Sequence, residues 1–141
     1  MKRLLLASLL LVGCASLAPQ GDEEVLARRD FVPVGRLDKA PKSDPRSLYD
    51  VRVENDSLKM FARFGGGCKE HVFTLYVARE SSSTVGVYVV HDAGQDDCKA
   101  WLDAYPVAFS LQFLKSDLNL KGPVTLVSHP GELEPFKVIY P

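Results

Sequence analysis

Hydrophobic and polar residues alternate along most of the chain after residue 47, which is the period of half-buried β-strands. The predicted strands are 31–37, two within 48–64, 71–78, 84–91, 107–114, 123–128 and 136–140. Asn55-Asp56 supplies a turn inside the second region, and Pro33 suits an edge strand. About seven short strands predict an all-β fold, an antiparallel β-sandwich or small barrel. One helical turn is expected in 97–105.

Strands 71–78 and 84–91 form a predicted hairpin that is closed by the turn sequence ESSST. An antiparallel register with Leu75 opposite Val87 puts the apolar side chains of both strands on one face, as burial requires. The same register places His71 opposite His91 at the open end of the hairpin. Two cysteines lie just beyond these histidines.

The N-terminal sequence MKRLLLASLLLVGC has the features of a secretory signal. Two cations precede an apolar stretch that is shorter than the roughly 20 residues needed to span a bilayer. The end of this stretch, Leu11–Cys14, resembles the lipobox of bacterial lipoproteins. The resemblance implies cleavage before Cys14, lipidation of its thiol and acylation of the new amine. Ala15, where an aspartate would signal retention, implies the outer membrane, on its periplasmic or cell-surface side. An ordinary signal peptide with a chance cysteine is the alternative.

The chain therefore divides into a signal peptide (1–13), a lipidated tether (14–30) and a single β-domain (31–141). Without residues 1–13, 15 Lys and Arg remain against 18 Asp and Glu, a net charge of about −3. The chain has no excess of basic residues that would indicate nucleic acid as a partner. The expected partners are the membrane, through the lipid on Cys14, and a protein of the envelope.

Cys68 and Cys98 remain once Cys14 is lipidated, and an even number of cysteines in an exported chain favours a disulfide. The closed loop of about 30 residues would stabilise the domain by roughly 3–4 kcal/mol in the chain-entropy description. Free thiols are one alternative. Zinc held by Cys68, His71, His91 and Cys98 is another, although their spacing differs from zinc-finger patterns.

The two histidines have three interpretations. They are residues at the edge of the core, or they bind a metal with a carboxylate, or they recognise another ligand. Facing imidazoles also predict acid sensitivity, because protonation near pH 6 would introduce two charges. The candidate ligand-binding residues are His71, His91, Asp92 and Asp97. We expect no cofactor.

The loop DAGQDD offers a weak calcium alternative through Asp92, Asp96 and Asp97, but a solvated turn is favoured because no downstream glutamate completes the pattern. The three glycines 65–67 either cradle an anion through backbone N–H groups or let the chain bulge, and the second interpretation is favoured.

No catalytic motif is recognisable, so the chain is not expected to be an enzyme. Glu132 and Glu134 are expected at a solvated edge. Trp101 and Tyr105 either pack against the disulfide, which is favoured, or form an exposed aromatic patch.

The region 65–115 resembles uncharacterised bacterial lipoproteins with a Gly-Gly-Cys-x-x-His strand and, more loosely, NigD-like lipoproteins. The matching positions are Gly66, Gly67, Cys68, His71, Phe73, His91, Asp92, Asp97, Cys98, Phe109 and Leu111. The resemblance implies an all-β domain without a known role. The function expected is that of a binding or structural module of the envelope. The alternatives are an inhibitor or accessory subunit of a secreted enzyme and a small metal-binding protein using His71 and His91.

Overall fold

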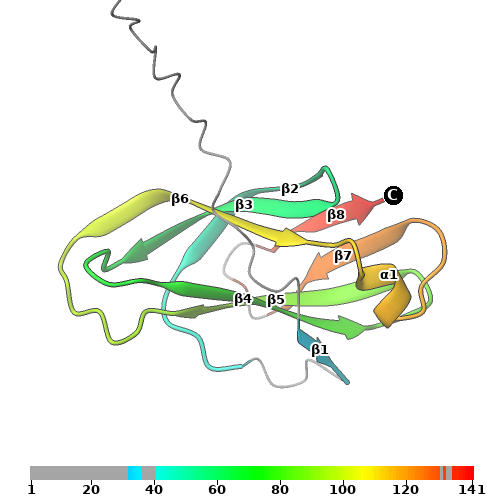
Figure 1. Ribbon diagram of the computed structural model, residues 1–141, viewed down its shortest axis with the longest axis horizontal. Coiled ribbons are helices and arrows are strands. Elements are labelled where there is room, and N and C mark those ends of the chain that lie inside the picture. Colours follow the sequence, from blue (N-terminus) through cyan, green and yellow to red (C-terminus); the bar gives the residue numbers. More distant parts are fainter. Residues whose placement is uncertain (1–31, 36–40, 131, 133–134) are drawn as a thin grey trace, which may run out of the picture.

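The computed structural model describes residues 32–35, 41–130, 132 and 135–141, which form a two-layer β-sandwich (Figure 1). The predicted signal peptide and tether lie outside the described residues. The elements are β1 (Val32–Val34), β2 (Ser47–Glu54), β3 (Ser57–Gly65), β4 (Val72–Arg79), β5 (Thr84–Asp92), β6 (Trp101–Ser110), α1 (Leu114–Asp117), β7 (Val124–Ser128) and β8 (Lys137–Tyr140). None of the helices described is long and apolar enough to cross a membrane.

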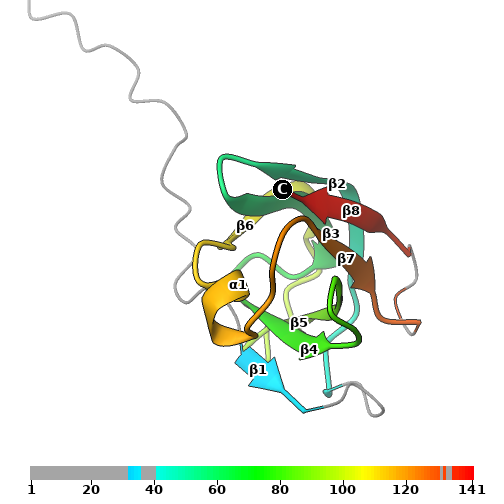
Figure 2. The ribbon, with the colours of Figure 1, turned by 90° about the vertical axis from the view of Figure 1, so that its right-hand side faces the viewer.

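One sheet has the strand order β1-β4-β5-β7-β8 and the other the order β2-β3-β6. Strand β8 lies beside β2 where the two sheets approach each other (Figures 1 and 2). Two pairings, β1 with β4 and β5 with β7, are parallel. The chain leaves β5, crosses to the other sheet through β6 and α1, and returns as β7. The expected all-β sandwich is confirmed, and the parallel pairing of β5 with β7 depends on this crossover, which periodicity does not reveal.

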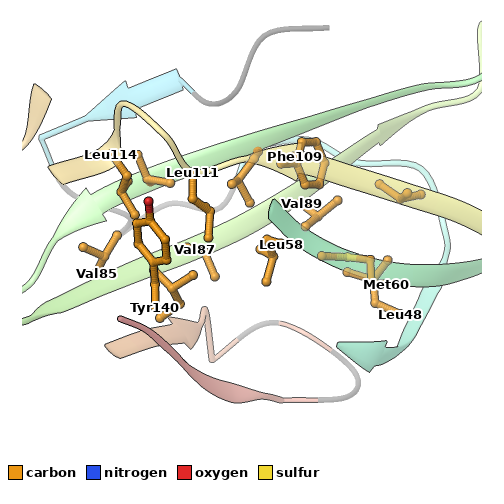
Figure 3. Packing of buried hydrophobic residues seen from close by; sticks show 14 of the residues in the cluster. Leu48, Leu58, Met60, Val85, Val87, Val89, Phe109, Leu111, Leu114 and Tyr140 are labelled. Atoms are coloured by element: carbon orange, nitrogen blue, oxygen red, sulfur yellow. The ribbon is translucent and has the colours of Figure 1, made fainter. Parts of the chain in front are cut away.

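The core fills the space between the sheets (Figure 3). Alternate residues of the central strands point into it, and Leu58, Leu75 and Val89 are fully buried. Leu111 and Leu114 close one end of the core, where α1 packs. Each such aliphatic side chain contributes about 1.5–3 kcal/mol through burial, so the apolar face holds the hairpin β4–β5 in place.

The register of this hairpin differs from the predicted one. Leu75 pairs with Val89, two residues beyond Val87. The turn is centred further along the chain, because the N–H groups of Glu80 and Ser81 both donate to the carbonyl of Thr84. A shift of two residues leaves each side chain on its predicted face, so the buried face of the hairpin is unchanged.

The helical turn expected in 97–105 is wrong, because Trp101–Tyr105 form the first half of β6. This strand pairs with β3 along its length, but the register shifts between Ala62 and Phe64 and breaks the two-residue alternation. The strand predicted over 107–114 ends at Ser110, and its last residue, Leu114, begins α1.

Candidate functional site

A disulfide between Cys68 and Cys98 joins the β3–β4 connection to the β5–β6 connection. The two Cα atoms are 5.8 Å apart, within the usual range for such a bond. The predicted pairing is confirmed. As disulfide sulfurs, these atoms do not offer the thiolates that the zinc alternative requires.

The carboxylate of Asp96 lies in a cradle of backbone N–H groups beside this disulfide. Its Oδ2 accepts hydrogen bonds from the N–H groups of Gly67, Cys68 and Lys69 at 2.7, 2.8 and 2.9 Å. Its Oδ1 accepts one from the Cys98 N–H at 2.9 Å. These donors hold the pKa of Asp96 well below its usual range, because they stabilise the charged form. Asp96 is therefore ionised in the folded domain near neutral pH.

The two glycines at the start of the cradle are required by its geometry. Gly66 and Gly67 have φ angles of +116° and +101°, a region that residues with a Cβ rarely adopt. A Cβ on Gly66 would also lie 2.7 Å from the Cε1 atom of His71. The glycine run thus does bind an anion, and that anion is the protein's own Asp96.

Asp96, His71 and His91 form a hydrogen-bonded chain, which we call the relay. His71 Nε2 lies 3.1 Å from Asp96 Oδ2, and His71 Nδ1 lies 2.7 Å from His91 Nε2. The two imidazole rings lie with centroids 4.9 Å apart and 21° between their planes, so the predicted contact between them is present. The predicted pairing of His71 with His91 is wrong, because Phe73 pairs with His91. Phe64 and Phe73 cover the rings, and the side chains of His71 and Asp96 are only 2% and 1% exposed.

The ionised Asp96 fixes the proton on one nitrogen of His71. Its Oδ2 can only accept, so His71 Nε2 must carry a proton and donate it. One proton lies between His71 Nδ1 and His91 Nε2, and the carbonyls of Pro45 and Asp44 lie beside the ring that carries His91 Nδ1. This Nδ1 atom is buried and has no hydrogen-bond partner among the described residues.

Burial lowers the pKa of His91, and the neighbouring His71 lowers it further, against smaller opposing effects of Asp44 and nearby carbonyls. Between this lowered pKa and the ordinary value of 6.5, the unfolded chain binds more protons at His91 than the folded chain does. The free energy of unfolding therefore falls as the pH falls below about 6.5.

We predict that the wild-type domain loses stability between pH 7.5 and 5.5, whereas His91→Gln, which cannot titrate, loses less. One linked proton contributes at most about 1.4 kcal/mol per pH unit. Urea unfolding at both pH values measures the difference. Equal losses in the two proteins would show that His91 does not carry the acid sensitivity.

An open groove of about 770 Å³ lies next to the relay. Its lining residues are Lys42, Asp44, Pro45, Gly65, Val90, His91, Asp92, Ala93, Gln95, Asp96, Asp97, Cys98 and Trp101. Three of the four predicted ligand-binding residues, His91, Asp92 and Asp97, are therefore at the groove. His71 lies behind them in the relay. Both aspartates are exposed, and Asp92 Oδ1 accepts a hydrogen bond from the Gly94 N–H.

The side chains of Trp101 and Tyr105, which are both in β6, lie in different environments. Trp101 pairs with Gly65 on β3, and its ring would lie 3.4 Å from a Cβ at that glycine. The Trp101 side chain lines the groove and is 62% exposed. Tyr105 packs on Phe64 and Phe73, so the favoured packing of this ring against the disulfide is wrong. The exposed aromatic surface is supplied by Trp101.

His71 and His91 are not arranged in the structure as the metal alternatives require. Both histidines and a carboxylate do converge, but the ring nitrogens face one another within hydrogen-bond distance and do not surround a common centre. Within the part of the chain that is described, the group close enough to share an ion is Cys68, Asp96 and Cys98, and its two sulfurs are joined.

The segment Ser43–Arg46 completes the free edge of β5 beside the relay. Strand β7 pairs with β5 only as far as Val87. Beyond it, the His91 N–H donates to Ser43 Oγ, and the Asp44 N–H donates to the His91 carbonyl. This segment therefore replaces a strand and forms one wall of the groove.

The side chains of Arg46 and Glu132 bond the next backbone groups along the same edge of β5. Arg46 donates to the carbonyl of Val89 and, at 2.7 Å, to Glu132 Oε1, which also accepts from the Val89 N–H at 3.3 Å. The Arg46 and Glu132 side chains are 7% and 4% exposed. The solvated position expected for Glu132 is wrong, because this edge of β5 needs buried partners for its backbone groups. Glu134 lies outside the described residues.

Sequence reasoning missed Arg46 and the pairing of Glu132, and it placed Asp96 only in the calcium alternative. No local pattern marks Arg46 or Glu132, since their partner strand is remote in the sequence. Asp96 had a signal, because three glycines before Cys68 and an aspartate before Cys98 are the parts of an anion cradle.

No protein-family model matches the chain, and no curated protein matches it. Among solved structures, the fold is similar to that of a NigD-like immunity protein from Bacteroides caccae, with a TM-score of 0.52 and 16% sequence identity. The similarity covers 77% of this chain and 58% of that protein, so this chain spans little more than half of its length. At this identity the likeness shows a shared fold, in agreement with the resemblance to NigD-like proteins in the sequence.

Proposed function

We propose that the protein is a lipid-anchored, non-catalytic binding protein of the outer membrane that uses the groove beside Trp101 to hold a protein partner. The observation that carries the proposal is a large exposed aromatic side chain on a rigidly supported groove. Tryptophan is enriched among the residues that dominate binding energy at protein interfaces. Trp101 is 62% exposed at the groove, so its ring is free to contact a bound partner.

The rigid support for this groove comes from the disulfide and from the Asp96 cradle. Both connect the β5–β6 loop to the β3–β4 loop. The relay then fills the space behind them with buried, hydrogen-bonded rings. Preorganised loops lose less conformational entropy on binding, which favours recognition of a partner.

Two further observations support an accessory or immunity-type role. The Leu11–Cys14 sequence resembles a lipobox, which favours a protein held at the envelope surface. A protein described as a NigD-like immunity protein shares the fold.

The proposal predicts that the tagged protein captures an envelope or secreted protein when cell envelopes are crosslinked. Trp101→Ala is expected to reduce the capture at least about tenfold, the effect of losing a central interface residue. Phe113→Ala is the matched control, because Phe113 is also largely exposed and precedes α1 at the opposite end of the sandwich (Figure 1). A Cys14→Ser bait tests the anchor, since it should leave the membrane fraction. Equal capture by the Trp101 and Phe113 variants, or lipid alone on the wild-type bait, would reject the proposal.

A further inference from the structure

The disulfide between Cys68 and Cys98 lies at the surface of the domain, where small thiols can reach it. Cys68 is exposed, and Cys98 is partly exposed and lines the groove. A bond in such a position is open to thiol–disulfide exchange, in which a thiolate attacks one sulfur and the other sulfur leaves as a thiolate. Burial does not shield this bond, so any protection must come from the chemistry of the neighbouring groups.

A fixed negative charge lies beside both sulfur atoms. One carboxylate oxygen of Asp96 and the Sγ atoms of Cys68 and Cys98 all lie within 4.8 Å of one another. The N–H groups of the cradle hold Asp96 in its charged form. The Asp96 side chain is only 1% exposed, so little water or salt screens its charge from the sulfur atoms.

The other charged residues that adjoin the two cysteines in the sequence do not add to this field. They are two cations and two anions, and all four are exposed: Lys69, Glu70, Asp97 and Lys99. Their charges sum to zero, and solvent screens them. The ammonium of Lys69 also donates to the Gln95 carbonyl at 2.7 Å. Asp96 therefore supplies the buried charge at the bond.

We propose that Asp96 protects the Cys68–Cys98 bond from thiols through its charge. In the exchange step a thiolate RS⁻ forms RS–S–Cys68, the Cys68–Cys98 bond breaks, and its electron pair stays on the Cys98 sulfur, which takes a proton from water. The reagent sulfur is oxidised and the Cys98 sulfur is reduced. The carboxylate opposes the negative charge that grows on the leaving sulfur, and it also repels the incoming thiolate.

This role of Asp96 is separate from its role in the cradle. The disulfide and the cradle both join the β3–β4 and β5–β6 connections. A carboxylate that served the cradle alone would fix these connections without changing how fast the bond reacts with one thiol relative to another. The inference does not depend on the proposed partner, and it is tested on the protein alone.

The test uses the full-length protein with Cys14→Ser, in which Cys68 and Cys98 are the remaining cysteines. The probes are three thiols of similar length: mercaptoethanesulfonate, which carries an extra negative charge, mercaptoethanol, which carries none, and aminoethanethiol, which carries a positive charge. Each is added in excess at neutral pH and low salt. Protein thiols are trapped with an alkylating agent over time and counted by mass spectrometry, which gives a rate constant for each probe.

Asp96→Asn is expected to raise the rate constant about tenfold with mercaptoethanol, by more with mercaptoethanesulfonate and by less with aminoethanethiol. Comparing one thiol between the variant and its parent cancels the intrinsic reactivity of the reagent. Asp97→Asn is the matched control, because it removes the same charge from the exposed neighbour of Cys98. It should change each rate constant less than about twofold.

The three thiols separate the charge of Asp96 from its hydrogen bonds. A cradle that is only loosened in Asp96→Asn would accelerate all three thiols by the same factor, and this result would overturn the inference. Unchanged rates in Asp96→Asn, or an equal acceleration in Asp97→Asn, would overturn it as well. An acceleration graded by the charge of the thiol supports it.

The parent protein provides a second measurement that needs no folded variant of Asp96. Its rate constant with aminoethanethiol, divided by that with mercaptoethanesulfonate, is compared with the same ratio for a small uncharged disulfide. We expect the protein's ratio to be larger at low salt by about tenfold, and to keep part of this excess at high salt because the charge is buried. Equal ratios for the protein and the small disulfide would contradict the inference.

Discussion

Replacing Cys68 and Cys98 together by serine is expected to lower the free energy of unfolding by about 3–4 kcal/mol. The disulfide closes a loop between residues 30 apart in the sequence, and the chain-entropy description assigns this stabilisation to a loop of that size. A small domain has a total stability of about 5–15 kcal/mol, so the loss is a large fraction of it. Urea unfolding of the wild type and the variant under non-reducing conditions measures the difference.

Two comparisons identify the cause of this loss. The wild type in reducing buffer should approach the stability of the double variant, because both lack the same bond. The Cys14→Ser protein retains the Cys68–Cys98 bond and should unfold at the wild-type urea concentration. A reduced wild type that is as stable as the oxidised protein would show that the Asp96 cradle alone holds the two loops together.

The features that periodicity predicts are those with a local signature. The hairpin β4–β5 has alternating apolar residues on both strands, so its buried face was predicted correctly even though its register was not. The disulfide followed from the symmetric placement of Cys68 and Cys98 about that hairpin. The contact between His71 and His91 followed from the same symmetry.

The choice among three aspartates in DAGQDDC has no such signature. Asp96 turns inward, whereas Asp92 and Asp97 stay exposed. Gly94 and Gln95 have left-handed backbone, with φ angles of 57° and 58°, in a turn in which the Asp96 N–H donates to the Ala93 carbonyl. A non-glycine residue in that region, such as Gln95, cannot be recognised from residue type alone.

The free edge of β5 is the second feature that required coordinates. Its backbone groups are bonded by residues from 43–46 and by Glu132, which arrive from distant parts of the chain. An acidic residue between two prolines reads as a solvated turn in the sequence. Only the tertiary structure shows that Glu132 faces the buried guanidinium of Arg46.

Glu132→Ala is therefore expected to destabilise the domain by about 3–5 kcal/mol, the cost of leaving one partner of a buried ion pair uncompensated. The variant leaves the Arg46 charge buried and removes the acceptor of the Val89 N–H. Asp103→Ala is the matched control, because it breaks an exposed ion pair with Arg63 whose side chains are 51% and 69% exposed. Such a surface pair contributes less than about 1 kcal/mol. Urea unfolding at pH 7 measures both losses.

A double variant distinguishes a stabilising ion pair from a merely compensated one. Burial raises the pKa of Glu132 even though Arg46 acts in the opposite direction, so desolvation of the carboxylate outweighs its attraction to the guanidinium. Between 4.5 and the raised pKa the folded chain binds more protons at Glu132 than the unfolded chain, so the free energy of unfolding falls as the pH rises through this range. Replacing both residues, as Arg46→Met with Glu132→Leu, should consequently cost less than Glu132→Ala alone, because no unpaired charge remains. A double variant less stable than either single variant would mean that the pair stabilises the edge of β5 through its charges as well as through its hydrogen bonds.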